Sequence, residues 1–156
     1  MEIQTGYLYH IKDDFFNIVN DKGLMVNHEN GNTRPTYLTI KDGDILWFIP
    51  LSSKVDKYKK IINDKMNKYG KCYSILIEKI FDKEAAVLIQ NAFPTIEKYV
   101  DHYHIRNKKP AKVSKKVKDS IINNFKETLK LKSLGINLFY SNIDLIKEQM
   151  LKELYN

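Results

Sequence analysis

The sequence is poor in the residues that hold small domains together by cross-links or metals. Cys72 is the only cysteine, so an internal disulfide is impossible, and no other cysteine or histidine lies at metal-ligand spacing from it. We expect a buried or half-buried thiol at this position. Zinc sites and disulfide frameworks built on cysteine are therefore excluded.

Long apolar runs are also missing. The longest span only a few residues, far short of the roughly 20 that cross a bilayer, and residues 1–10 lack the basic-then-apolar layout of a signal peptide. With 156 residues, 43% of them hydrophobic and 12% aromatic, the chain is predicted to fold as one domain over residues 1–156. The expected location is the cytoplasm, without a membrane partner.

Arginine is scarce in a basic chain. Of 26 basic residues only Arg34 and Arg106 are arginines, and the net charge is +7. The charge gathers in two segments, 54–71 and 106–132, in which basic residues far outnumber acidic ones. Such segments favour a polyanionic partner, commonly nucleic acid, but lysines that only solvate helix faces would give the same pattern.

Hydrophobic periodicity predicts strands first and helices later. The expected strands are 6–11, 35–41, 45–51, 73–81, 85–90 and a mixed segment at 96–104, with turns at 42–43 and 82–84. The expected helices follow Ser52 or Ser53 as the N-cap and stop at Gly70, follow Ser114 and stop before Gly135, and follow a capping box at 141–144. Residues 20–33 have the composition of an extended loop, which at this length tends to be functional. Together these strands and helices predict an α+β fold with a mostly antiparallel sheet or barrel and added helices.

The chemistry that this pattern suggests is cleavage of RNA. Without a metal, the reaction needs a group that activates the 2′-hydroxyl, donors for the developing phosphorane charge and a proton for the leaving 5′-oxygen. The planar guanidinium of Arg34 can donate hydrogen bonds to two phosphate oxygens, and Pro35 favours an extended backbone at Arg34, the residue before it. At the end of the third strand, Ser52, Ser53 and Lys54 open a helix whose amides can cradle phosphate. Pairing of the two strands would bring Arg34 and Ser52 side by side.

Each piece has an ordinary structural interpretation. A serine before a helix is more often an N-cap, and an arginine before proline is more often a surface side chain. The histidines His102 and His104 could bind metal if extended, but no third ligand is evident, because Asp101 would face the opposite side. We expect surface or RNA-facing histidines and no metal. Phe93, Pro94 and the tyrosines could stack on bases, although most are expected in the core.

Several motifs together carry a family resemblance. In order they are G-Y-L-Y-H-I, a polar loop, T-R-P-T-Y-L-T-I, P-L-S-S-K and N-A-F-P-T-I-E-K. Over nearly the whole chain this order resembles the type III toxin–antitoxin endoribonucleases of the ToxN/AbiQ kind, nearest the CptN/TenpN branch. Residues 6–104 are more distantly similar to the MazF/Kid toxins, in which a strand opens with R-P.

The resemblance implies an SH3-like, MazF/Kid-type barrel and metal-independent, cofactor-free cleavage of single-stranded RNA to 2′,3′-cyclic phosphate and 5′-hydroxyl ends. It also implies inhibition by a small, pseudoknot-like repeat RNA in an assembly with two or more copies of each partner. Arg34 matches the toxins' catalytic arginine and Ser52 their hydroxyl residue, whereas Ser53 and Lys54 match the T-S-x-K cluster only with one residue deleted. The ToxN-like proteins have a tyrosine in the preceding loop that has no clear counterpart in this sequence. His28 or Asn30 is the candidate to take its place.

The remaining predicted contacts are with substrate or antitoxin RNA. Thr36, if it faces the cleft, would contact substrate, although a β-branched strand residue is more often structural. The full set of RNA-contacting candidates is Asn27, His28, Asn30, Thr36, Lys57, Lys59, Lys60, Lys108, Lys109, Lys112, Lys115 and Lys116. A non-catalytic RNA-binding module and a protein-interaction domain stay open as alternatives.

Overall fold

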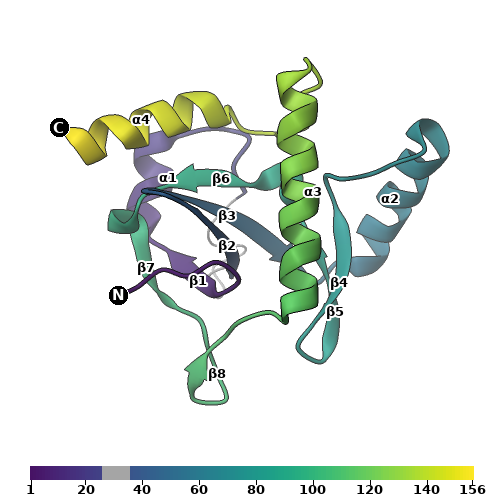
Figure 1. The fold of residues 1–156 in the computed structure, drawn as a ribbon, viewed down its shortest axis with the longest axis horizontal. Helices are drawn as coiled ribbons and strands as arrows, with labels where there is room; N and C mark the ends of the chain where they lie inside the picture. Colours follow the sequence, from purple (N-terminus) through teal and green to yellow (C-terminus); the bar gives the residue numbers. More distant parts are fainter. Residues whose placement is uncertain (26–35) are drawn as a thin grey trace.

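The computed structural model describes residues 1–25 and 36–156, and its centre is an antiparallel sheet (Figure 1). Strands pair in the order β4-β5-β3-β2-β1-β7, and β6 pairs with β3 off this path. A separate two-stranded ribbon, β8-β9, projects from the body. The bounds are β1 Leu8–Ile11, β2 Tyr37–Asp42, β3 Ile45–Ser52, β4 Leu76–Ile80, β5 Lys83–Val87, β6 Phe93–Thr95, β7 Val100–Tyr103, β8 Ile105–Arg106 and β9 Lys109–Pro110.

The long strand β3 organises the sheet because both of its edges are paired. One edge pairs with β2, from Asp42 opposite Ile45 to Tyr37 opposite Pro50. The other edge pairs first with β6 and then, at Leu51 and Ser52, with β5. The end of β3 therefore passes from the main sheet into the β4-β5 arm, and the helix that follows it starts at that boundary.

In the described residues, four helices surround the sheet, together with two single 3-10 turns at Ile89–Asn91 and Glu97–Tyr99. The helices are α1 Asp13–Val19, α2 Val55–Tyr69, α3 Lys115–Ser133 and α4 Ile143–Tyr155. In Figure 1, α3 crosses in front of the strands, α4 lies across the top, and α2 stands apart beside the β4-β5 arm. None of the described helices is long and apolar enough to cross a membrane.

Aromatic side chains fill the core between sheet and helices. Tyr9, Phe15, Tyr37, Phe48 and Phe93 are all among the largest fully buried side chains. Phe93 stacks on Phe15 with ring centroids 5.0 Å apart and meets the Tyr37 ring edge-on at 5.3 Å. Burying each such side chain contributes about 1.5–3 kcal/mol, so Phe93 belongs to the core and not to a base-stacking surface.

The predicted α+β class is confirmed: the sheet is antiparallel, one helix follows β3 and two helices end the chain. Two turns differ from the sequence prediction. The β2-β3 loop consists of Gly43 and Asp44, because Asp42 still pairs with Ile45, and Gly43 takes the positive φ of 62°. The β4-β5 loop consists of Phe81 and Asp82, with Phe81 at a φ of 61°.

Candidate functional site

The junction between β3 and α2 forms a compact turn. The Ser52 hydroxyl accepts a hydrogen bond from the Lys54 backbone amide at 3.2 Å, and the Ser53 carbonyl accepts one from the Val55 amide at 2.9 Å. Lys54 is the N-cap residue of α2, which corrects the prediction that Ser52 or Ser53 caps the helix. Ser53 and Lys54 are exposed and Ser52 is half-buried.

This junction has the chemistry of an anion site. First-turn amides and the helix dipole favour negative charge at the start of α2, and the exposed Ser53 hydroxyl and Lys54 add a polar group and a cation. Asp56 in the first turn is the competing carboxylate. The ordinary role of Ser52, to close the turn before the helix, is visible in its bond to Lys54.

The arginine half of the predicted centre lies outside the described residues, as do Asn27, His28 and Asn30. The proximity of Arg34 to Ser52 therefore stays a prediction. Thr36 is the first described residue after that stretch and is half-buried. Within the described residues, the β2-β3 ladder reaches Tyr37 and Pro50, two positions short of Ser52.

Three of the four histidines gather at the edge of the sheet, on β1 and around the end of β7. His10 Nε2 and His104 Nδ1 lie 3.0 Å apart in a hydrogen bond, and the His10 ring stacks on His102 at 4.6 Å between centroids. His102 Nδ1 lies 3.4 Å from the Asp101 carboxylate, which corrects the prediction that Asp101 faces away. Burial, and then the neighbouring His102, lower the pKa of His104.

The sequence predicts that His102 and His104 lie on one side of an extended segment, but it does not predict that His10 joins them. The antiparallel register puts His10 opposite His102, so the missing partner comes from a strand more than 90 residues earlier. The only local signal was the alternation in Y-L-Y-H-I. Among the described residues no group of histidine, cysteine and carboxylate side chains is arranged to hold a metal ion.

The predicted lysines of α2 are all exposed, although two have neighbours. Lys59 forms an ion pair with Glu84 at 3.1 Å, and the Lys57 ammonium lies 5.3 Å from the centre of the Tyr58 ring. Lys60 is exposed on the same helix. These contacts are solvent-exposed, so each is worth little, and the side chains can turn to a polyanion at small cost.

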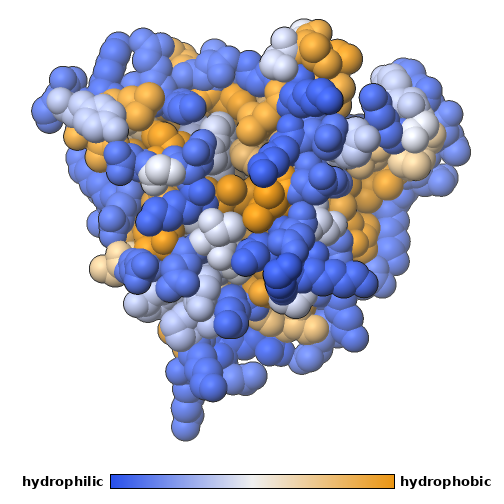
Figure 2. Space-filling model, in the orientation of Figure 1, coloured by the Kyte–Doolittle hydropathy of each residue, from blue (hydrophilic) through white to orange (hydrophobic). Residues whose placement is uncertain are grey.

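The second basic segment runs from the β8-β9 ribbon into α3. Lys108 and Lys109 lie on the ribbon, whose tip is the hydrophilic projection at the bottom of Figure 2. Further along, Lys112 lies over the Tyr7 ring at 5.9 Å, Lys115 pairs with Asp119 at 3.0 Å, and Lys116 is exposed. Lys112 and Lys115 line a hollow of about 370 Å³ at the start of α3.

Arg106, the other arginine, holds the ribbon against the body. Its guanidinium lies 4.3 Å from the centre of the Phe81 ring and donates to the Asp82 carboxylate at 2.7 Å. This explains why a phenylalanine occupies the strained turn position between β4 and β5. Arg106 is therefore assigned a structural role.

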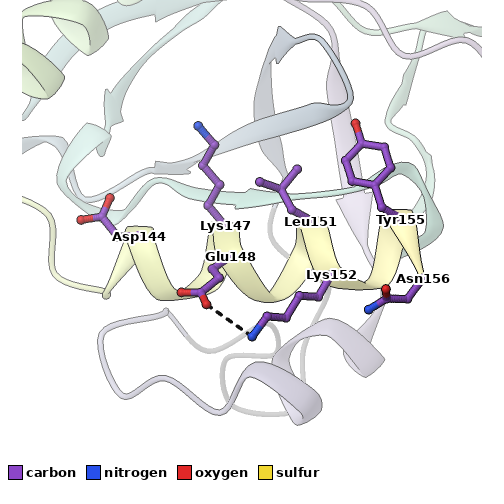
Figure 3. A pocket seen from close by; sticks show the side chains of 7 residues that line it. All are labelled: Asp144, Lys147, Glu148, Leu151, Lys152, Tyr155 and Asn156. Carbon is purple, nitrogen blue, oxygen red and sulfur yellow. Dashed lines mark ion pairs between the residues drawn. The ribbon is translucent and has the colours of Figure 1, made fainter.

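A hollow of about 460 Å³ lies along α4, away from these groups (Figure 3). Its lining comes from α4 and the residue after it, and it is shallow, with the Glu148–Lys152 ion pair at 3.3 Å along its side. The lining holds carboxylates and lysines, but Glu148 and Lys152 are paired with each other. We assign it no catalytic role.

Comparison with known proteins identifies a fold rather than a family. No family model matches the sequence, and no curated protein matches it. A solved structure does: AbiQ, described as a lactococcal anti-phage endoribonuclease belonging to the type III toxin–antitoxin system. The match covers 98% of this chain and 100% of that one, with a TM-score of 0.72 and 14% sequence identity. From end to end, this chain has the fold of AbiQ.

Proposed function

We propose that the chain is an endoribonuclease toxin of the type III toxin–antitoxin kind, with residues 1–156 as one nuclease domain. The observation that carries the proposal is the end-to-end fold similarity to AbiQ, which leaves almost no part of either chain unmatched. The separate motif resemblance in the sequence supports the CptN/TenpN branch. The expected setting is the cytoplasm, in defence against phage.

The reaction proposed is metal-independent attack of a ribose 2′-hydroxyl on the adjacent phosphorus, with departure of the 5′-oxygen. Lys54 or a serine hydroxyl at the start of α2 helps to deprotonate or orient the 2′-hydroxyl. Arg34 and the first-turn amides of α2 bind the developing charge, and Arg34, Lys54 or His28 protonates the leaving oxygen. Neither a metal nor a cofactor is needed.

The location of this centre rests on two observations. The Ser52 hydroxyl and the Lys54 amide are held together at the exposed start of α2. Thr36, two residues after Arg34, adjoins Tyr37, which pairs with Pro50 of β3. The proposal therefore places the centre where this end of the sheet meets the start of α2.

The partner proposed is a small repeat-derived RNA that the toxin processes and that then inhibits it. Its backbone would bind the lysines of α2 and of the β9-α3 segment, so affinity should fall steeply with salt. Because these two basic segments lie on separate elements, one RNA could contact two protein copies in a closed assembly. Thr36, Asn27, His28 and Asn30 are assigned to the substrate.

The experiment is incubation of the purified protein with single-stranded RNA in EDTA. We expect cleavage, 2′,3′-cyclic phosphate ends, and no cleavage where a 2′-deoxy nucleotide replaces the one that attacks. Arg34→Ala should abolish cleavage and cellular toxicity while the protein remains folded. A non-catalytic RNA-binding module, the alternative, would bind with the same salt dependence and release no fragments in any buffer.

A further inference from the structure

In the three-histidine cluster, which consists of His10, His102 and His104, each ring makes different contacts. His10 uses Nε2 to hold Nδ1 of His104, and its ring stacks on that of His102. Asp101 lies against Nδ1 of His102. In both His102 and His104 the Nδ1 atom is therefore engaged, which leaves Nε2 as the atom through which each ring can meet a ligand.

The cluster lies at the same end of the sheet as the proposed catalytic residues. Tyr9 pairs with Tyr37 on β2, and Tyr37 pairs with Pro50 on β3, so β1 is two strands away from the strand that ends at Ser52. Neighbouring strands are about 4.8 Å apart, so β7, which carries His102 and lies beyond β1, is about 14 Å from β3. A short piece of single-stranded RNA spans that distance.

The surroundings of the cluster allow positive charge to form there. His102 has 57% of its side chain exposed, and His104 is half-buried. The charged groups on the adjoining elements are Asp101 on β7, and Lys12 and Asp13 where β1 passes into α1. Arg106, on β8, is engaged by Asp82. Of these groups, Asp101 contacts the cluster, at Nδ1 of His102, and its charge competes with an anion there.

We propose that His102 and His104 form a second RNA-binding subsite, in which their protonated Nε2 atoms donate to a backbone phosphate that flanks the cleaved linkage, with His10 as the positioning residue. The proposal rests on the proposed function, because it takes RNA as the ligand. A protonated His104 keeps its bond to His10 by donating from Nδ1. Binding takes up protons from solvent, so affinity rises as pH falls through the histidine range.

Because His104 is partly buried, phosphate binding and protonation of the His104 ring depend on one another. Partial burial and His102 favour the neutral form of His104 and lower its pKa in the free protein. A phosphate placed against the ring reverses that preference. The pKa of His104 should therefore be higher in the RNA complex than in the free protein, and the difference is a direct readout of contact.

The test measures binding of a fluorescein-labelled 2′-O-methyl RNA of about twelve nucleotides, which cannot be cleaved because its 2′-oxygens are blocked. Dissociation constants are measured from pH 8.0 to 5.5 at fixed salt, with and without EDTA, for the wild type and for the double variant H102Q/H104Q. We expect the wild type to tighten about tenfold more than the double variant over this range, since a charge-assisted hydrogen bond is worth about a factor of ten or more. H10N should flatten the profile partially.

Lys147→Gln on α4 is the matched control. It removes one positive charge at every pH, so any effect on affinity should be uniform and the pH profile should keep its slope. Far-UV circular dichroism and a thermal melt of each variant establish that it is folded. NMR titration of the imidazole signals, with and without the RNA, reports whether the pKa of His104 rises.

Two results would overturn the subsite. If the double variant binds RNA with the wild-type pH profile, the dependence comes from His28 or another group and the subsite is wrong. If EDTA abolishes the pH dependence, the histidines bind metal rather than phosphate. Cleavage of unmodified RNA by the wild type would leave the proposed function standing in either case, whereas absence of cleavage and of binding at every pH would remove both.

Discussion

Replacement of Ser52 by alanine separates the catalytic role of its hydroxyl from its structural role. The hydroxyl accepts the Lys54 amide at the start of α2, so its removal costs stability whether or not RNA is a substrate. Loss of such a side-chain-to-backbone hydrogen bond typically costs about 1 kcal/mol, and up to about 1.5. These values set the size of the structural effect.

That cost is too small to mimic a catalytic defect. A domain of this size is stable by about 5–15 kcal/mol, so even a 2 kcal/mol loss from the low end leaves only about 1% of the molecules unfolded. Removal of a group that stabilises the transition state instead lowers the rate about a hundred- to a thousandfold. Ser52→Ala should therefore lower single-turnover cleavage by about two orders of magnitude while the protein remains folded.

Asn142→Ala supplies the matched control. Asn142 caps α4 by accepting the Leu145 amide at 3.1 Å, so the substitution also removes one side-chain-to-backbone hydrogen bond at the start of a helix, and α4 contributes no residue to the proposed centre. Urea unfolding should show a similar loss of about 1 kcal/mol for both variants, but only Ser52→Ala should lose cleavage. A Ser52→Ala protein that cleaves at half the wild-type rate or faster would refute the catalytic assignment of Ser52.

Three further predictions concern other parts of the molecule. Gly23→Ala should destabilise the protein by about 3 kcal/mol in urea unfolding, because a Cβ at Gly23 would overlap the backbone carbonyl of Tyr140, and a change below 1 kcal/mol would contradict this packing. Arg106→Ala should cost only about 1 kcal/mol, because its partner Asp82 is 84% exposed, so a larger loss would show that the β8-β9 ribbon supports the core. The hydrogen bond from the Tyr99 hydroxyl lowers the pKa of Glu153. The bond therefore contributes stability that is present above about pH 4.3 and is lost as pH falls through the folded-state pKa. Tyr99→Phe should make the stability less dependent on pH in the acid range, and an unchanged dependence would refute this coupling.

The parts of the fold that sequence could predict are those decided by local physics. Gly70 ends α2 in the left-handed region, and Ser114 caps α3 by accepting the Val117 amide, both as periodicity and capping rules indicate. The α4 start shows the limit of the same rules. The capping box pointed to Ser141, but Ser141 is buried and Asn142 caps the helix instead, because the chain is fixed there by the bond from the Asn142 amide to Asp21.

The parts that sequence could not predict depend on contacts between distant segments. Phe81 adopts a positive φ that a phenylalanine rarely takes, and the compensation is the Arg106 guanidinium on its ring, 25 positions later in the chain. The three-histidine cluster likewise exists only because β1 pairs with β7. In both cases tertiary contacts outweigh the local preference, and single-sequence periodicity does not report them.

In the candidate centre, the scarcity of arginine limits which residue can bind the phosphorane. A phosphorane is best held by a planar guanidinium, which grips two oxygens, whereas lysine offers a point charge. Arg106 instead packs on Phe81 and pairs with Asp82 on the side of the ribbon, where the proposal places no catalytic residue. If this protein cleaves RNA with a guanidinium of its own, that guanidinium has to be Arg34, and the many lysines of the surface are left to bind the RNA backbone.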